Sequence, residues 1–136
     1  MKTIKIKFIA ILVLVAGIGG ACSLDDKDQY CFTSQYTGVK SISGPSATTV
    51  NTPITINVSY IPLGSCGEFN KFTETNEFPK DIKVLVDYEG CNCPATDTAD
   101  TVPYTFTATT PGEYVVNFLT GNEITPKITK TITVTE

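Results

Sequence analysis

The five cysteines are the residues of this chain with the widest chemical repertoire, because a cysteine thiolate can attack an electrophile, ligate a soft metal or enter a disulfide. They are Cys22, Cys31, Cys66, Cys91 and Cys93. Disulfides use cysteines in pairs, so an odd number in an exported chain predicts that one of them has a different role. If a lipid occupies Cys22, four cysteines remain for two disulfides.

Two pairings of these four cysteines are open. Cys91 and Cys93 are separated by one residue, and a bond between them would close a small, strained ring. The remaining pairings are Cys66–Cys91 with Cys31–Cys93, or Cys66–Cys93 with Cys31–Cys91. A metal site of Cys66, Cys91 and Cys93 is the alternative, but C-x-C without a C-x-x-C partner fits zinc sites poorly. We therefore predict disulfides and no metal or other cofactor.

The chain contains no histidine, and all ten of its basic residues are lysines. Without an imidazole it lacks the general base of Ser-His-Asp and Cys-His sites. Without arginine it lacks the bidentate donor that favours phosphate and guanine. The net charge of −4 also repels polyanions. The sequence thus predicts no nucleic-acid partner and leaves carboxylate, lysine and cysteine chemistry open.

Acidic side chains offer two further hypotheses. Glu68, Glu74 and Glu77 lie near the cysteine loop, and a glycosidase needs two carboxyl groups about 5 to 10 Å apart. Asp97 and Asp100 are hard oxygen ligands for calcium, but their spacing fits no EF-hand loop. No tryptophan platform accompanies the glutamates. We interpret both groups as solvated loop charges and predict that the protein is not an enzyme.

Aromatic side chains suggest a binding surface instead. Phe69, Phe72 and Phe78 are candidates for an exposed patch that binds a glycan or a protein partner. Phenylalanine at strand spacing is more often part of a core. The interpretation of these residues as core is the favoured one.

The first 21 residues have the pattern of a secretory signal. Three lysines among residues 2–7 precede an apolar run at 8–18, which is shorter than the roughly 20 residues of a membrane-spanning helix. Small residues then lead to Cys22. Cleavage there would leave 7 lysines and 14 acids, a net charge of −7. We predict a signal peptide at 1–21, a lipidated acidic tether at 22–37 and one domain at 38–136.

From Val39 onward apolar and polar residues alternate, as in half-buried strands. Residues 53–61 place Ile54, Ile56, Val58 and Tyr60 on one face, and residues 81–90 repeat the pattern. Further strands are predicted at 39–43, 68–74, 102–108, 113–119 and 128–135, with Gly- or Pro-containing turns between many of them. Seven strands predict an all-β, immunoglobulin-like antiparallel sandwich, with a small barrel as the alternative.

Tyr114 follows the turn "TTPGE" and precedes an alternating strand. A tyrosine in this position can fold its hydroxyl back onto the backbone as a tyrosine corner. The alternative is an ordinary strand aromatic.

The stretch "GGAC" followed by "SLDD" resembles the lipobox and acidic follow-on segment of lipoproteins in Bacteroidetes-type bacteria. The resemblance implies that Cys22 carries the lipid and that the protein is held at the outer membrane, facing the periplasm or the cell surface. Gly19 departs from the pattern, since a large aliphatic residue usually stands three before the cysteine.

The body, from "ISGPSATTVNTPITINVSY" through "YEGCNC" to "ITKTITVT", resembles small immunoglobulin-like lipoproteins of the same bacteria. That resemblance implies a fold and a location, and no catalytic residue. The triplets "DTA" and "DTV" resemble the O-glycosylation motif of these bacteria, which implies modification at Thr98 and Thr101. Together these expectations describe a non-enzymatic, lipid-anchored envelope domain with a binding, adhesive or structural role and an unidentified ligand. A carbohydrate-active enzyme or glycan-binding accessory protein, using surface carboxylates or aromatic residues, is the alternative.

Overall fold

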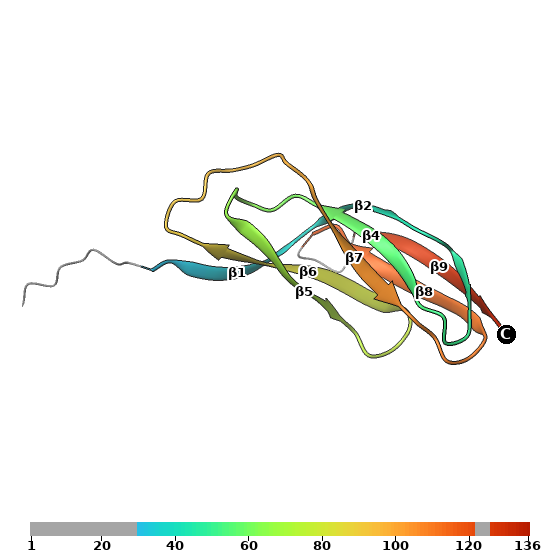
Figure 1. Cartoon of the computed structure of the whole chain (residues 1–136). Coiled ribbons are helices and arrows are strands. Elements are labelled where there is room, and N and C mark those ends of the chain that lie inside the picture. Colours follow the sequence, from blue (N-terminus) through green and yellow to red (C-terminus); the bar gives the residue numbers. More distant parts are fainter. Residues whose placement is uncertain (1–29, 122–125) are drawn as a thin grey trace, which may run out of the picture.

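The computed structural model describes residues 30–121 and 126–136, which form nine strands and no helix (Figure 1). Cys22, Gly19 and the predicted signal peptide lie outside the described residues. The strands are β1 (Phe32–Thr37), β2 (Val39–Ser43), β3 (Ala47–Thr49), β4 (Ile54–Tyr60), β5 (Gly67–Glu74), β6 (Lys80–Glu89), β7 (Asp100–Phe106), β8 (Gly112–Leu119) and β9 (Lys127–Thr135).

The strands form two sheets packed against each other (Figure 1). The large sheet has the order β1-β6-β8-β9-β3, with β5 also paired to β6, and the small sheet has the order β2-β4-β7. The predicted β-sandwich is confirmed, and the barrel alternative is wrong because the sheets do not close on each other.

All seven predicted strands are present, and their alternation builds the core. Ile56, Val58 and Tyr60 of β4 are buried, as are the alternate residues of β6 from Ile82 to Tyr88. These two strands belong to different sheets, so their apolar faces meet between the layers. Burial of such side chains contributes about 1.5–3 kcal/mol each, which makes the period-two faces the main source of stability.

Two strands were not predicted. Strand β3 is three residues long, too short to show a period. Strand β1 lies in the segment assigned to the tether, which corrects the predicted boundary because residues 32–37 belong to the folded domain. Five of its six side chains are exposed, and Thr37 alone is buried. Its sequence therefore lacks the inward apolar residues that reveal a strand.

Two strand pairings are parallel, whereas the rest are antiparallel. β6 and β8 pair in parallel over Lys80–Ile82 and Val116–Phe118. Between β6 and β8 the chain crosses to the small sheet and forms β7. Its direction therefore reverses twice, and β8 runs parallel to β6. The short β3 pairs in parallel with β9.

The predicted tyrosine corner is present. The Tyr114 hydroxyl donates to the carbonyl oxygen of Thr110 at 2.9 Å, and the Thr110 hydroxyl lies 2.8 Å from the Tyr114 hydroxyl oxygen. The Tyr114 ring packs against Phe106 and Phe78, with ring centroids 5.6 and 4.9 Å apart. Tyr114 therefore fixes the turn that precedes β8 to the edge of the core.

Gly38 lies where the chain passes from β1 in the large sheet to β2 in the small sheet. A Cβ atom at this position would overlap the carbonyl oxygen of Thr120, just after the end of β8. We expect Gly38→Ala to lower the free energy of unfolding by about 1–3 kcal/mol, the usual cost of overpacking, as measured by urea denaturation. Gly121→Ala is the control, because its Cβ would meet no atom within 4 Å. Equal stability of the two variants would contradict this account.

Candidate functional site

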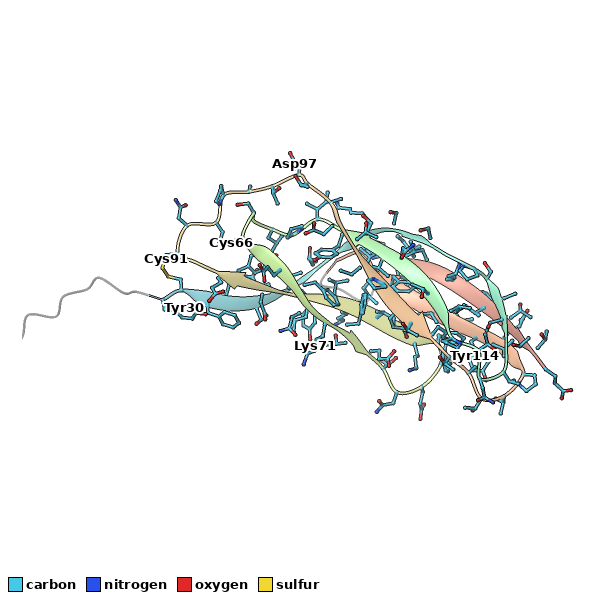
Figure 2. The ribbon with its side chains drawn as sticks, viewed as in Figure 1. Tyr30, Cys66, Lys71, Cys91, Asp97 and Tyr114 are labelled. Atoms are coloured by element: carbon cyan, nitrogen blue, oxygen red, sulfur yellow. A yellow bond between two sulfur atoms is a disulfide. The ribbon has the colours of Figure 1, made fainter. Side chains whose placement is uncertain are left out.

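The four described cysteines form two disulfides at one end of the sandwich (Figure 2). Cys31 pairs with Cys91 and Cys66 with Cys93, with Cα atoms 4.9 and 5.5 Å apart. This is the second of the two pairings that the sequence left open. The bonds join the start of β1 and the loop before β5 to the loop after β6. The two disulfides therefore link three segments of the chain that are distant in sequence.

Two of the three glutamates considered as catalytic acids, Glu68 and Glu74, lie too far apart to act as a pair. Glu68 is the second and Glu74 the last residue of β5, and the six residue steps between them separate their Cα atoms by roughly 20 Å. Desolvation acts to raise the pKa of Glu74, but hydrogen bonds from Tyr104 at 2.7 Å and from Lys80 outweigh it and lower that pKa. A general acid needs a raised pKa. Glu77 lies exposed in the loop after β5.

The residues considered for calcium and for glycosylation lie in or beside the loop before β7. Asp97 is exposed in this loop, and Asp100 begins the strand. Among the described residues, no group of three or more metal-ligating side chains occurs. Thr98 and Thr101 are both exposed, so a glycosyltransferase could reach their hydroxyls; their modification stays a prediction.

The proposed patch of Phe69, Phe72 and Phe78 is not a single surface. Phe69 and Phe72 pack against the core, with ring centroids 4.9 Å apart, and Phe72 meets the ring of Tyr104 edge-on at 5.3 Å. Phe78 is exposed but lies against Phe106 at 6.3 Å. The interpretation as core therefore holds for the first two residues, and the patch is wrong.

A different aromatic surface lies on β1 and the residues just before it. Tyr30, Phe32 and Tyr36 expose 68, 55 and 40% of their surface. In the antiparallel pair with β6, Phe32 is opposite Glu89 and Tyr36 is opposite Leu85. Val86 and Tyr88 of β6 face the core, and they lie opposite Gln35 and Thr33. Since side chains alternate along a strand, Phe32 and Tyr36 point the other way, away from the small sheet. Figure 2 shows Tyr30 and Lys71 on the same, lower side of the large sheet in this view.

Polar side chains between these rings are held in fixed directions. Asp87 accepts hydrogen bonds from the Ser34 hydroxyl at 2.6 Å and from the Asn70 amide at 2.7 Å. The Asn70 bond and then the Ser34 bond lower the pKa of Asp87, which keeps its carboxylate charged. The ammonium group of Lys83 lies 5.4 Å from the centroid of the Tyr36 ring, a cation–π contact.

We call this surface the β1 face. It consists of Tyr30, Phe32, Ser34 and Tyr36 with the neighbouring Asn70, Lys83 and Asp87. The rings of Tyr30 and Phe32 are parallel to within 4°, with centroids 6.4 Å apart. The Tyr30 hydroxyl donates to Glu89, and this bond is the main cause of a raised Tyr30 pKa.

A pocket of about 290 Å³ adjoins the β1 face at Tyr36. Lys83, Thr73 and Leu119 are among the residues that line it, together with Asp81. Its size suits one ring-sized group, at the lower limit of ligand pockets. The aromatic strip and the pocket thus form one continuous surface through Tyr36.

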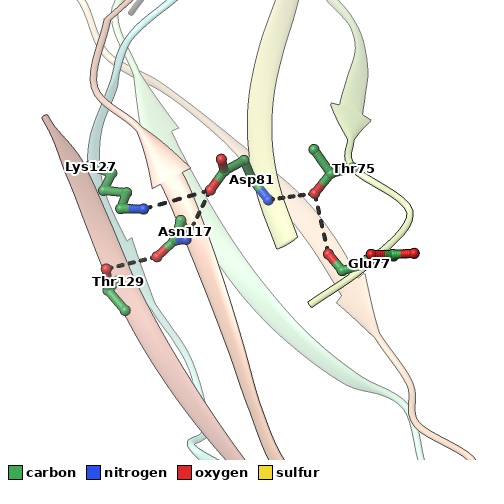
Figure 3. Close-up of polar contacts among 6 residues, drawn as sticks. All are labelled: Thr75, Glu77, Asp81, Asn117, Lys127 and Thr129. Carbon is green, nitrogen blue, oxygen red and sulfur yellow. Dashed lines mark hydrogen bonds and ion pairs between the residues drawn. The ribbon is translucent and has the colours of Figure 1, made fainter. Parts of the chain in front are cut away.

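Asp81 is fixed by a polar network across three strands (Figure 3). Its Oδ1 atom accepts a hydrogen bond from Asn117 at 2.8 Å and lies 3.9 Å from the Lys127 ammonium. Asn117 is buried, and its amide oxygen accepts a hydrogen bond from the Thr129 hydroxyl at 2.8 Å. The backbone N–H of Asp81 also donates to the Thr75 hydroxyl. This wall of the pocket is therefore preorganised.

Sequence reasoning missed the β1 face because it assigned Tyr30, Phe32, Ser34 and Tyr36 to the tether. The available signal was the alternation in "YCFTSQYT", where all three aromatic residues have even numbers and the odd-numbered positions hold only cysteine, threonine and glutamine. That pattern alone does not show which side of the strand faces solvent. The pairing with β6 is needed to place the aromatic side outward. A comparison with protein-family models, curated proteins and solved structures found no match to this chain.

Proposed function

We propose that the protein is an exported, lipid-anchored domain of the cell envelope that acts by binding and carries out no catalysis. The observation that carries the proposal is the cysteine pairing, because two disulfides use Cys31, Cys66, Cys91 and Cys93 and leave Cys22 outside them. Two disulfides also support an oxidising compartment. A left-over cysteine at the end of a signal-like segment is the position that a lipid would occupy.

The anchor lies close to the binding surface in this proposal. Tyr30 is eight residues after Cys22, and a fully extended chain of that length spans at most about 30 Å. In Figure 1, β1 enters at one end of the elongated sandwich and the C terminus lies at the other. Within the described part of the chain, no helix has the length and hydropathy to span a membrane. Attachment through several acyl chains is effectively stable.

A binding role is supported over an enzymatic one by the chemistry of the side chains. The sequence offers no imidazole for proton transfer. The lowered pKa of Glu74 is opposite to that of a general acid. The β1 face, by contrast, exposes three aromatic rings and orients hydrogen-bonding groups between them. These are properties of a recognition surface.

We expect Cys22→Ala to abolish incorporation of radiolabelled fatty acid, because the thiol is the group that accepts the lipid. Ser23→Ala is the matched control and should keep the label. The measurement is autoradiography of the immunoprecipitated chain after growth with labelled palmitate. Persistence of the label in the Cys22→Ala variant would contradict the anchor. Protease shaving of intact cells then shows whether the domain faces outward.

A further inference from the structure

We propose that the β1 face and its adjoining pocket bind a neutral oligosaccharide. This inference rests on the proposed binding function and names its ligand class. A sugar ring has faces of C–H groups and a rim of hydroxyls. Exposed aromatic rings with hydrogen-bonding groups beside them match both features of such a ring.

The aromatic rings supply the first requirement. Phe32 and Tyr36 are four residues apart on one strand, which places them roughly 13 Å apart along it. Tyr30 extends the strip with a ring parallel to that of Phe32. This spacing suits a chain of linked sugars, because successive rings can stack along the strand direction. The pocket beyond Tyr36 has room for one terminal ring.

The hydrogen-bonding groups supply the second requirement. Asp87 uses one oxygen for Ser34 and the other for Asn70, so it orients both side chains without itself being the binding group. The Ser34 oxygen retains acceptor capacity, and the Asn70 amide retains a second N–H and its carbonyl oxygen. A sugar hydroxyl both donates and accepts, which matches this mixed set.

The charge of the surface selects a neutral glycan. By strand register, the outward positions around the β1 face carry more carboxylates than ammonium groups. The acidic ones are Glu68, Asp81, Asp87 and Glu89, and the basic ones are Lys71 and Lys83. The whole chain is also negative. An acidic glycan would be repelled, whereas a neutral one pays no such cost.

A lipid surface fits the same face less well. Aromatic side chains near an anchor can enter a membrane interface, but here Asp87 and Glu89 lie between and beside the rings. Burial of those carboxylates against acyl chains would leave charges uncompensated. The alternation of ring faces and polar groups within one strand favours the sugar.

The test uses the full chain purified in a polyoxyethylene detergent, since a sugar-headed detergent would compete. An array of neutral and acidic oligosaccharides is screened first, and the best neutral ligand is then titrated by calorimetry. We expect Phe32→Ala and Tyr36→Ala each to weaken binding at least tenfold. Leu63→Ala is the matched control and should stay within twofold. Leu63 is 59% exposed and lies beside Thr33 and Gln35, on the opposite side of β1.

Three outcomes overturn the inference. They are the absence of any bound neutral glycan, binding that both aromatic variants retain, and equal or tighter binding of a uronic-acid oligosaccharide. Sedimentation of the Cys22→Ala chain with phosphatidylethanolamine–phosphatidylglycerol vesicles checks the lipid alternative. If adding Phe32→Ala abolishes this co-sedimentation while the array shows no bound glycan, the β1 face binds the membrane instead. Fatty-acid labelling at Cys22 is independent of all these results, so failure here leaves the anchor standing.

Discussion

Replacement of Phe118 by alanine will lower the free energy of unfolding by about 3–5 kcal/mol, as measured by urea denaturation. Phe118 is fully buried in β8. Its ring meets Tyr104 of β7 edge-on, with centroids 5.7 Å apart, so it joins the large sheet to the small one. The neighbouring strands place Ile82 and Ile128 opposite it. Truncation therefore removes a large apolar side chain and leaves a cavity that the surrounding strands cannot fill.

The matched control is Phe32→Ala, which removes the same side chain from the β1 face. Phe32 is 55% exposed and touches Tyr30 rather than the core. We expect its free energy of unfolding to change by about 0.5 kcal/mol or less. A large loss of stability in Phe32→Ala, or a small one in Phe118→Ala, would contradict the assignment of inner and outer faces. The control also shows that a binding defect in Phe32→Ala does not come from unfolding.

Removal of the Cys31–Cys91 disulfide, by alanine at both positions, is expected to lower the free energy of unfolding by about 2–4 kcal/mol. The bond closes 60 residues of chain, against 27 for Cys66–Cys93, and a longer loop gives the larger entropic effect. A second consequence is local. Most β1 side chains are exposed, so β1 is held by its backbone pairing to β6 and by this bond. Hydrogen exchange of the β1 amides should therefore accelerate.

The double variant of Cys66 and Cys93 is the control for the local effect. It should lose global stability as well, but the β1 amides should stay protected, because Cys31 still joins β1 to the end of β6. Denaturant titration and hydrogen exchange on both variants separate the two effects. Unchanged exchange of β1 in the Cys31/Cys91 variant would show that its backbone pairing alone holds the strand. Loss of β1 would also disrupt the proposed glycan surface.

The strands that form the core could be predicted from the sequence, because burial of one face leaves a direct record in the order of residues. In β4, Ile56, Val58 and Tyr60 alternate with polar residues, and the structure buries each of them. The tyrosine corner at Tyr114 left a similar record, since its bond reaches only four residues back. The sequence pattern therefore predicted features that depend on residues close together in the chain, such as strand alternation and the Tyr114 turn.

The choice between the two disulfide pairings needed contacts between distant segments. Next to the paired strands β1 and β6, the Gly90 N–H donates a hydrogen bond to the Cys31 carbonyl oxygen at 2.8 Å. This contact places Cys31 beside Cys91. A bond from Ser65 N–H to the Pro94 carbonyl, also 2.8 Å, does the same for Cys66 and Cys93. Spacing in the sequence excluded one connectivity, and only these contacts between distant loops decided between the other two.

The sequence by itself determined the all-β class, the seven main strands and the even set of four cysteines, because each depends on residue type and short-range periodicity. The tertiary structure decided that residues 32–37 form a strand and that Phe32 and Tyr36 point outward. For Phe69 and Phe72 it confirmed the favoured interpretation, since both pack against the core. The physical reason is that strand alternation fixes which residues share a face, while only packing against another sheet determines which face meets water.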